Sequence, residues 1–149
     1  VKMALLENGL FVVEDVVRGQ WAALKREEAI KTTASQDGHE VEIWQEQEPG
    51  SGGKESAEAT VRNLAGYLVQ SERPTGSKGA RANPYAAQCQ AHNVKLLRGA
   101  WNKAFVDEHH NFDPVKAESG SLVCDQVDAA ALAFNKIAGR GFSPRVRRF

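Results

Sequence analysis

The chain has 149 residues, the length of one ordinary domain, which is enough to bury a hydrophobic core. Nineteen basic residues balance nineteen acidic ones, so the net charge creates no overall field that favours nucleic acid. No apolar run approaches the length of a membrane span. The two cysteines lack metal-ligand spacing, and a reduced compartment is the simpler expectation.

Charge nevertheless falls into alternating blocks. Residues 40–58 and residues 104–128 each contain six acidic residues and one basic residue, which gives each block a net charge of −5. Between them, residues 59–103 contain seven basic residues and one acidic residue, for a net charge of +6. Acidic pockets that hold metal beside basic surfaces that hold phosphate would produce this alternation, and so would chance.

The chain opens with two apolar, β-branched runs, residues 1–6 and 10–17, joined by Glu7-Asn8-Gly9. Asn-Gly between such runs is the strongest short signal for a β-hairpin. The first run already has the pattern of a strand at Val1, so we expect this chain to be a fragment. A helix is predicted at 21–34, where apolar residues recur on one face.

The central stretch is 41–54, in which apolar and polar residues first alternate as in a strand that Pro49 ends. Glu46 and Glu48 share one face of this strand, because side chains alternate with a period of two. Two carboxylates beside the glycine-rich loop at 50–53 are hard oxygen ligands that suit a divalent metal ion. A strand with a charged, solvated face is an equal alternative.

Helices and short strands alternate in the rest of the chain. We expect helices at 54–67, 84–91, 101–110 and 125–137, strands at 68–69 and 94–97, and loops at 73–81 and 112–121. This order indicates an α/β fold with a mixed sheet and an antiparallel hairpin at its edge. The expected domain covers residues 1–139, and residues 140–149 form a basic tail.

Asp125 and Asp128 begin the last predicted helix, three residues apart, so both can face outward from its first turn. The helix dipole alone also favours acidic residues there. Together with Glu46 and Glu48 they provide two carboxylate pairs on two elements. Two metal ions held by such a cluster can activate water and stabilise the leaving oxygen of a phosphodiester.

Five segments spread through nearly the whole chain add a more specific signal. They are 45–54 (Gln45 to Lys54), Leu64-Ala65-Gly66-Tyr67, 73–82 (Arg73 to Ala82), 93–102 (Asn93 to Asn102) and Asp125-Gln126-Val127-Asp128-Ala129. In this order they resemble the C-terminal nuclease domain of the large terminase subunit of tailed phages. The resemblance implies a ribonuclease H-like fold and an endodeoxyribonuclease that cuts concatemeric viral DNA with Mg2+ or Mn2+ in a two-metal carboxylate site.

Within the resemblance, Glu46 matches the family's glutamate at the end of the central strand, and Glu48 is next in line. Asp125 matches the acid at the start of the last helix. Many relatives have two consecutive aspartates where this chain has Cys124-Asp125, which leaves open whether Asp128 contributes. Glu46 and Asp125 are therefore expected to be metal ligands, with Glu48 and Asp128 as auxiliary ligands or orienting groups.

The resemblance also implies a third acid on a first strand upstream of the hairpin, for which Asp15 is a poor substitute. An ATPase domain of the same polypeptide would precede the nuclease domain. The other implied partners are double-stranded DNA, the portal protein and the small terminase subunit, in the cytoplasm of an infected bacterium and transiently at the procapsid portal. No membrane partner is expected.

Four basic residues are predicted to contact DNA phosphates, although an ordinary solvated loop is an equal alternative: Lys54, Arg73, Lys78 and Arg81. Two other functions also stay open. One is a different ribonuclease H-like nuclease of the resolvase or transposase type, and the other is a non-catalytic docking module for the portal or regulatory subunit.

Overall fold

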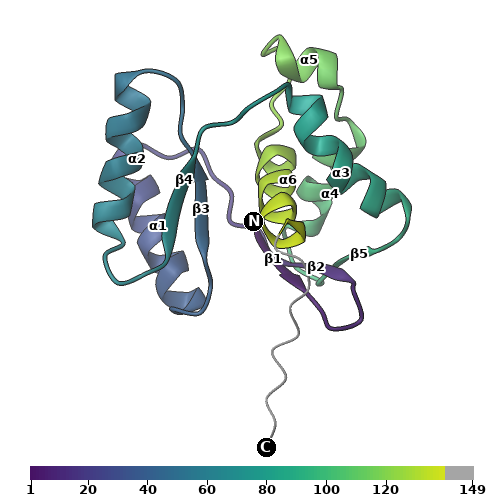
Figure 1. Ribbon diagram of the computed structural model, residues 1–149, viewed down its shortest axis with the longest axis horizontal. Coiled ribbons are helices and arrows are strands. Elements are labelled where there is room, and N and C mark those ends of the chain that lie inside the picture. Colours follow the sequence, from purple (N-terminus) through teal and green to yellow (C-terminus); the bar gives the residue numbers. More distant parts are fainter. Residues whose placement is uncertain (140–149) are drawn as a thin grey trace, which may run out of the picture. The chain divides into compact units, whose positions relative to one another are not determined.

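A computed structural model describes residues 1–139 and shows an α/β protein with six helices and five strands in that range (Figure 1). The strands are β1 (Lys2–Leu5), β2 (Phe11–Asp15), β3 (Ile43–Glu46), β4 (Val69–Glu72) and β5 (Val94–Leu96). The helices are α1 (Ala23–Asp37), α2 (Ser51–Asn63), α3 (Lys78–Gln90), α4 (Asn102–His110), α5 (Pro114–Glu118) and α6 (Asp125–Ala138). None of these helices combines the length and apolar character needed to cross a membrane. The predicted basic tail lies outside the described residues.

The chain divides into two compact units. Unit 1 contains residues 1–17 and the chain from residue 76 onward, and therefore holds β1, β2, β5 and helices α3 to α6. Unit 2 contains residues 18–75 and holds α1, β3, α2 and β4. The range expected to form one domain, 1–139, is thus shared between two units.

The five described strands form two sheets, whereas the sequence predicted one. In unit 1 the order is β1-β2-β5, with β1 antiparallel and β5 parallel to β2 (Figure 1). The predicted mixed sheet with an antiparallel hairpin at its edge is therefore confirmed there. Gly9 takes a positive φ of 82° in the hairpin turn, a conformation that glycine adopts without strain. In unit 2, β3 and β4 pair with each other in parallel.

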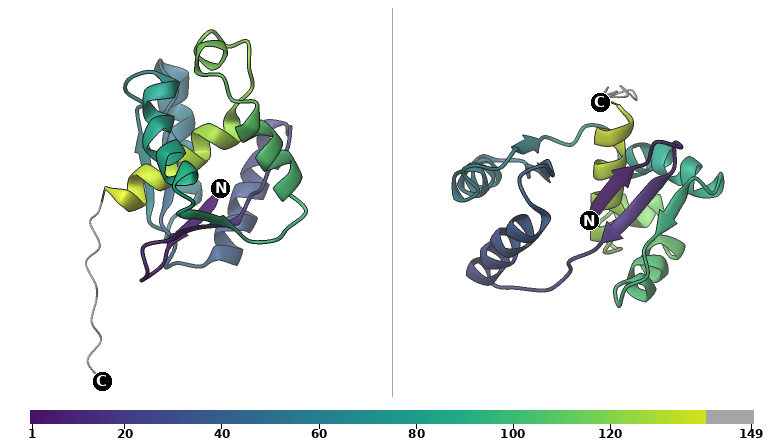
Figure 2. Two further views of the ribbon diagram at one scale, coloured as in Figure 1. Left: turned by 90° about the vertical axis from the view of Figure 1, so that its right-hand side faces the viewer. Right: turned by 90° about the horizontal axis from the view of Figure 1, so that it is seen from below.

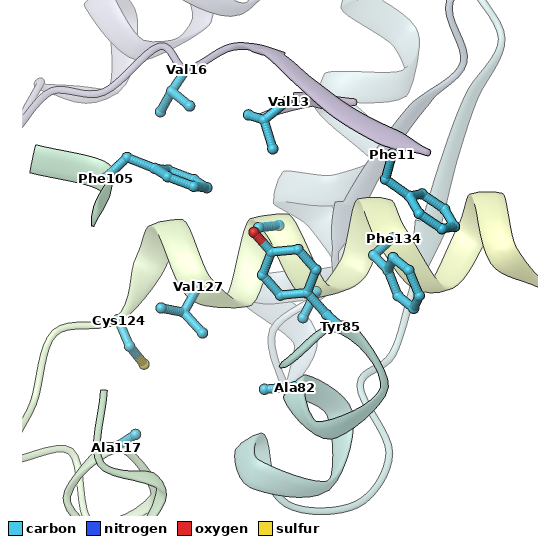
Figure 3. Packing of buried hydrophobic residues seen from close by; sticks show 12 residues of the cluster. Phe11, Val13, Val16, Ala82, Tyr85, Phe105, Ala117, Cys124, Val127 and Phe134 are labelled. Atoms are coloured by element: carbon cyan, nitrogen blue, oxygen red, sulfur yellow. The ribbon is translucent and has the colours of Figure 1, made fainter. Parts of the chain in front are cut away.

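The core of unit 1 lies between the sheet and helices α3, α4 and α6 (Figure 3). Phe11 of β2 and Phe134 of α6 meet with ring centroids 4.6 Å apart, and Val13 is completely buried beside them. Helix α6 also lies beside β1, as the right-hand view of Figure 2 shows. The residues predicted on its buried face are in place except Ala138, which is exposed in the last turn.

Helix α3 begins at Lys78, so the prediction of a loop over 73–81 and of a helix start at Pro84 is wrong. Ser77 caps the helix, because its Oγ accepts a hydrogen bond from the Ala80 backbone N at 3.2 Å. The Glu118 carboxylate accepts a second one from the Lys78 backbone N at 2.8 Å. Pro84 therefore lies inside the helix, where it gives up one backbone hydrogen bond.

Helix α2 begins at Ser51, so Gly52 and Gly53 belong to a helix and not to the predicted flexible loop. The absence of a side chain at Gly53 is required, because a Cβ there would collide with the Glu48 carbonyl oxygen. The helix ends at Asn63, earlier than predicted. These glycines therefore allow the chain that leaves β3 to pass close to the helix that follows.

Helix α5 interrupts the stretch 112–121 that was predicted to be a loop. The Asp113 carboxylate caps it by accepting hydrogen bonds from the backbone N atoms of Val115 at 2.9 Å and Lys116 at 3.2 Å. Pro114 occupies the first helical position, where its missing N–H costs nothing. A cap followed by proline was the signal that the sequence analysis missed.

A buried imidazole in α4 bears directly on acid stability. His109 Nδ1 donates a hydrogen bond to the Phe105 carbonyl oxygen at 2.7 Å, and the two rings lie 4.0 Å apart. The Tyr85 ring, which lies beside Cys89, meets the imidazole edge-on. Nε2 is buried and has no hydrogen-bond partner among residues 1–139. Burial lowers the pKa of His109, although the Phe105 carbonyl and the Glu108 charge act in the opposite direction.

The free energy of unfolding is expected to fall as the pH drops below about 6.5, the ordinary pKa of histidine. The unfolded chain then binds a proton at His109 that the folded chain refuses until lower pH, so stability rises with pH in this window. Urea unfolding at about pH 7.5 and about pH 5.5 measures the effect. His109→Phe should flatten the dependence, whereas His110→Phe, at an exposed neighbour, should preserve it. An unaltered slope in His109→Phe would contradict the assignment.

Candidate functional site

The first predicted carboxylate pair lies at the carboxyl end of β3 in unit 2. Glu46 is the last residue of this strand, and Glu48 lies two residues beyond it; both are exposed. Parallel pairing places the last residue of β4, Glu72, in register with Glu46. Side chains of residues in register project from the same face of a sheet. Glu72 is therefore a third acidic residue at this edge, which the sequence analysis did not include.

Glu72 could not have been recognised from local spacing. It lies 26 positions after Glu46 in the numbering, in a strand that was predicted only at 68–69. Had β4 been extended to its observed end and paired in parallel with β3, the two strand ends would have met. Pairing, and not motif spacing, is the signal that brings these two carboxylates together.

The second predicted pair lies in the first turn of α6 in unit 1, as expected. Asp125 is the first residue of the helix and is exposed, whereas the side chain of Asp128 is only 16% exposed. Asp15, the poor substitute for the upstream acid, ends β2 and is exposed. The two aspartates of α6 therefore have different surroundings and different chemistry.

Asp128 is surrounded by cationic side chains of α3. Lys78 Nζ lies 2.6 Å from its Oδ2, and an Arg81 guanidinium nitrogen lies 3.7 Å from its Oδ1. The same Lys78 ammonium donates to Cys124 Sγ at 3.2 Å. Hydrogen bonding to Asp128 raises the pKa of Lys78, against the opposing effect of burial, so the ammonium stays charged at neutral pH. Burial raises the pKa of the Cys124 thiol, which stays protonated.

The first turn of α6 is held by Glu108 of α4, which no sequence pattern indicated. Its carboxylate accepts hydrogen bonds from the backbone N atoms of Gln126 and Val127 at 2.6 and 3.3 Å. It also accepts one from the Gln126 side chain at 2.5 Å. Cys124, the N-cap residue, makes no side-chain cap hydrogen bond, so Glu108 supplies the cap from another helix. This contact fixes the turn that presents Asp125.

The four basic residues predicted to contact DNA divide evenly between the units. Lys54 in α2 is 60% exposed and lies 3.7 Å from Glu58, and Arg73 follows β4 and lies against the side-chain amide of Gln47. Lys78 and Arg81 lie in α3 beside Asp128. The latter two can contact phosphate only if their interactions with Asp128 are loosened.

The structure thus brings Glu46 together with Glu72, and Asp128 together with Lys78 and Arg81. Glu46 and Asp125 belong to different units. Within residues 1–139, no three His, Cys, Asp or Glu side chains are grouped as a complete metal site. By donor type, the exposed carboxylates still suit Mg2+, which commonly takes one or two of them and completes its shell with water and substrate oxygens.

Comparison of the chain with models of known protein families, with curated protein sequences and with solved structures finds no significant match.

Proposed function

We propose that this chain is the metal-dependent endonuclease domain of a tailed-phage terminase large subunit, with a ribonuclease H-like fold, which cuts concatemeric DNA during packaging. The main support is the ordered resemblance of its five segments to that family. Two structural facts are consistent with it. Glu46 lies at the carboxyl end of a strand, and Asp125 is the first residue of the last described helix.

In this proposal Glu46 and Asp125 bind Mg2+ or Mn2+, with Glu48 as an auxiliary group. The bound ions would activate the attacking water and stabilise the leaving oxygen of the phosphodiester. Glu108 positions the turn that presents Asp125, because it accepts the hydrogen bonds of that turn's buried N–H groups. Lys78 neutralises Asp128, so that this carboxylate does not stay buried with an unbalanced charge.

Lys54 and Arg73 are the basic residues best placed to contact phosphate in the proposed complex, because neither forms a short ion pair of the kind that holds Lys78. Such contacts give affinity without reading sequence. The proposed partners are double-stranded DNA, the ATPase domain of the same polypeptide, the portal protein and the small terminase subunit. The proposed location is the cytoplasm of the infected host and, transiently, the procapsid portal.

Incubation with supercoiled plasmid tests the proposal. Nicked and linear DNA are expected with Mn2+ or Mg2+, none with excess chelator, and cleavage should return when metal is restored. Any residues encoded upstream of Val1 should be retained, because the resemblance implies a further acidic ligand there. A folded protein that binds DNA or portal protein but never cuts in either metal would contradict the proposal and favour the docking module.

A further inference from the structure

Lys78 and Asp128 form the shortest ion pair of the part-buried side chains in α3 and α6. The ammonium lies 2.6 Å from Oδ2, and the two side chains are 31% and 16% exposed. Water screens such a pair less than it screens a pair on an open surface. The ammonium therefore already occupies a position against Asp128 Oδ2 that an approaching cation would need.

Two neighbours shape this position. Cys124 Sγ accepts a second hydrogen bond from the ammonium at 3.2 Å and donates to Asp128 Oδ2 at 3.4 Å. Arg81 lies on the other carboxylate oxygen, Oδ1, at the longer distance of 3.7 Å. Oδ2 is thus the more tightly held oxygen, and Lys78 is the group that holds it.

We propose that the Lys78 ammonium competes with a divalent metal ion for the Asp128 carboxylate. The inference rests on the proposed metal-dependent function. A dication that coordinates Oδ2 must displace the ammonium, because the same oxygen cannot serve both at close range and the two cations repel each other. Metal loading then releases Lys78 from Asp128 and Cys124, and the freed ammonium becomes available to a DNA phosphate.

Calorimetric titration of the whole chain with Mn2+ tests the competition. Lys78→Met keeps an unbranched stem but removes the charge, and it should bind Mn2+ roughly 10-fold more tightly than the wild type. Lys116→Met is the matched control, because Lys116 pairs with Asp113 in α5 at 3.7 Å and is well exposed. It removes the same charge from unit 1 and should change the affinity by less than about twofold.

A second substitution shows whether the gain passes through Asp128. In an Asp128→Asn background, Lys78→Met should no longer tighten Mn2+ binding, because the carboxylate for which the two cations compete is absent. Circular dichroism of each variant verifies the fold. Titration with diamagnetic Mg2+ gives a direct readout, since the side-chain NMR signals of Lys78 should shift towards those of a solvated ammonium.

The outcomes separate this inference from the proposed function. Wild-type cleavage with unchanged Mn2+ affinity in Lys78→Met overturns the competition and leaves the nuclease proposal standing. Tighter Mn2+ binding in Lys78→Met without any DNA cleavage supports the competition and contradicts the nuclease. A gain that persists in the Asp128→Asn background, or an absence of Mn2+ binding in both the wild type and Lys78→Met, overturns the inference.

Discussion

Replacing Glu46 by glutamine or Asp125 by asparagine is expected to slow metal-dependent plasmid cleavage by roughly 10²-fold or more. Each change keeps the shape of the side chain but removes the negative charge that a direct metal ligand supplies. Both residues are exposed, so their loss should leave the packing of either unit intact. Single-turnover rates measure the effect, and circular dichroism should show the fold preserved.

Glu48→Gln and Asp128→Asn are the matched controls, for which a loss of only about 10-fold is expected. Glu48 lies beyond the end of β3, and a ligand must be held rigidly to be effective. The Asp128 carboxylate is already bound to Lys78. If Glu48→Gln were inactive while Glu46→Gln kept its activity, the assignment along this strand would be wrong by two residues.

Replacing Glu108 by alanine is expected to lower the free energy of unfolding by roughly 2–4 kcal/mol. The carboxylate is the acceptor for the backbone N–H groups of Gln126 and Val127, residues that are only 4% and 3% exposed. Alanine leaves both groups without an acceptor in a place that water reaches poorly. Urea unfolding followed by circular dichroism gives the change directly.

Asp107→Ala is the matched control, because it removes an acid from the adjacent position of the same helix. Asp107 is 55% exposed and pairs with Lys103 four residues earlier at 2.5 Å. Such exposed pairs contribute only about 0.3–0.5 kcal/mol. Equal losses in the two variants would mean that Glu108 acts through general helix electrostatics and not as the cap of α6.

Elements with a strong local signal were predicted well. The hairpin at Asn8-Gly9 and helix α6 are examples, since turn chemistry specifies the first and apolar periodicity the second. The start of α3 was predicted too late, because Pro84 drew the boundary and Ser77 was hidden among glycines and basic residues. Helix α5 is shorter than two turns and has no periodicity to detect.

The candidate site was predictable only where residues act within one element. The first-turn position of Asp125 follows from the start of the last helix, and Glu46 from the end of a strand. Lys78 and Asp128 are 50 positions apart, and Glu108 caps a helix that begins 17 positions later. Such contacts depend on how helices pack, so no local spacing in the sequence reveals them.

The insertion of unit 2 between two parts of unit 1 has a consequence for synthesis on the ribosome. The hairpin emerges first, but Phe11 finds its partner Phe134 only about 120 residues later, roughly 6–25 s at ordinary elongation rates. Unit 2 is continuous and emerges completely during that interval. The nascent hairpin meanwhile exposes apolar side chains and open strand edges, the features that drive aggregation. It is the segment of the growing polypeptide with the greatest need of a chaperone.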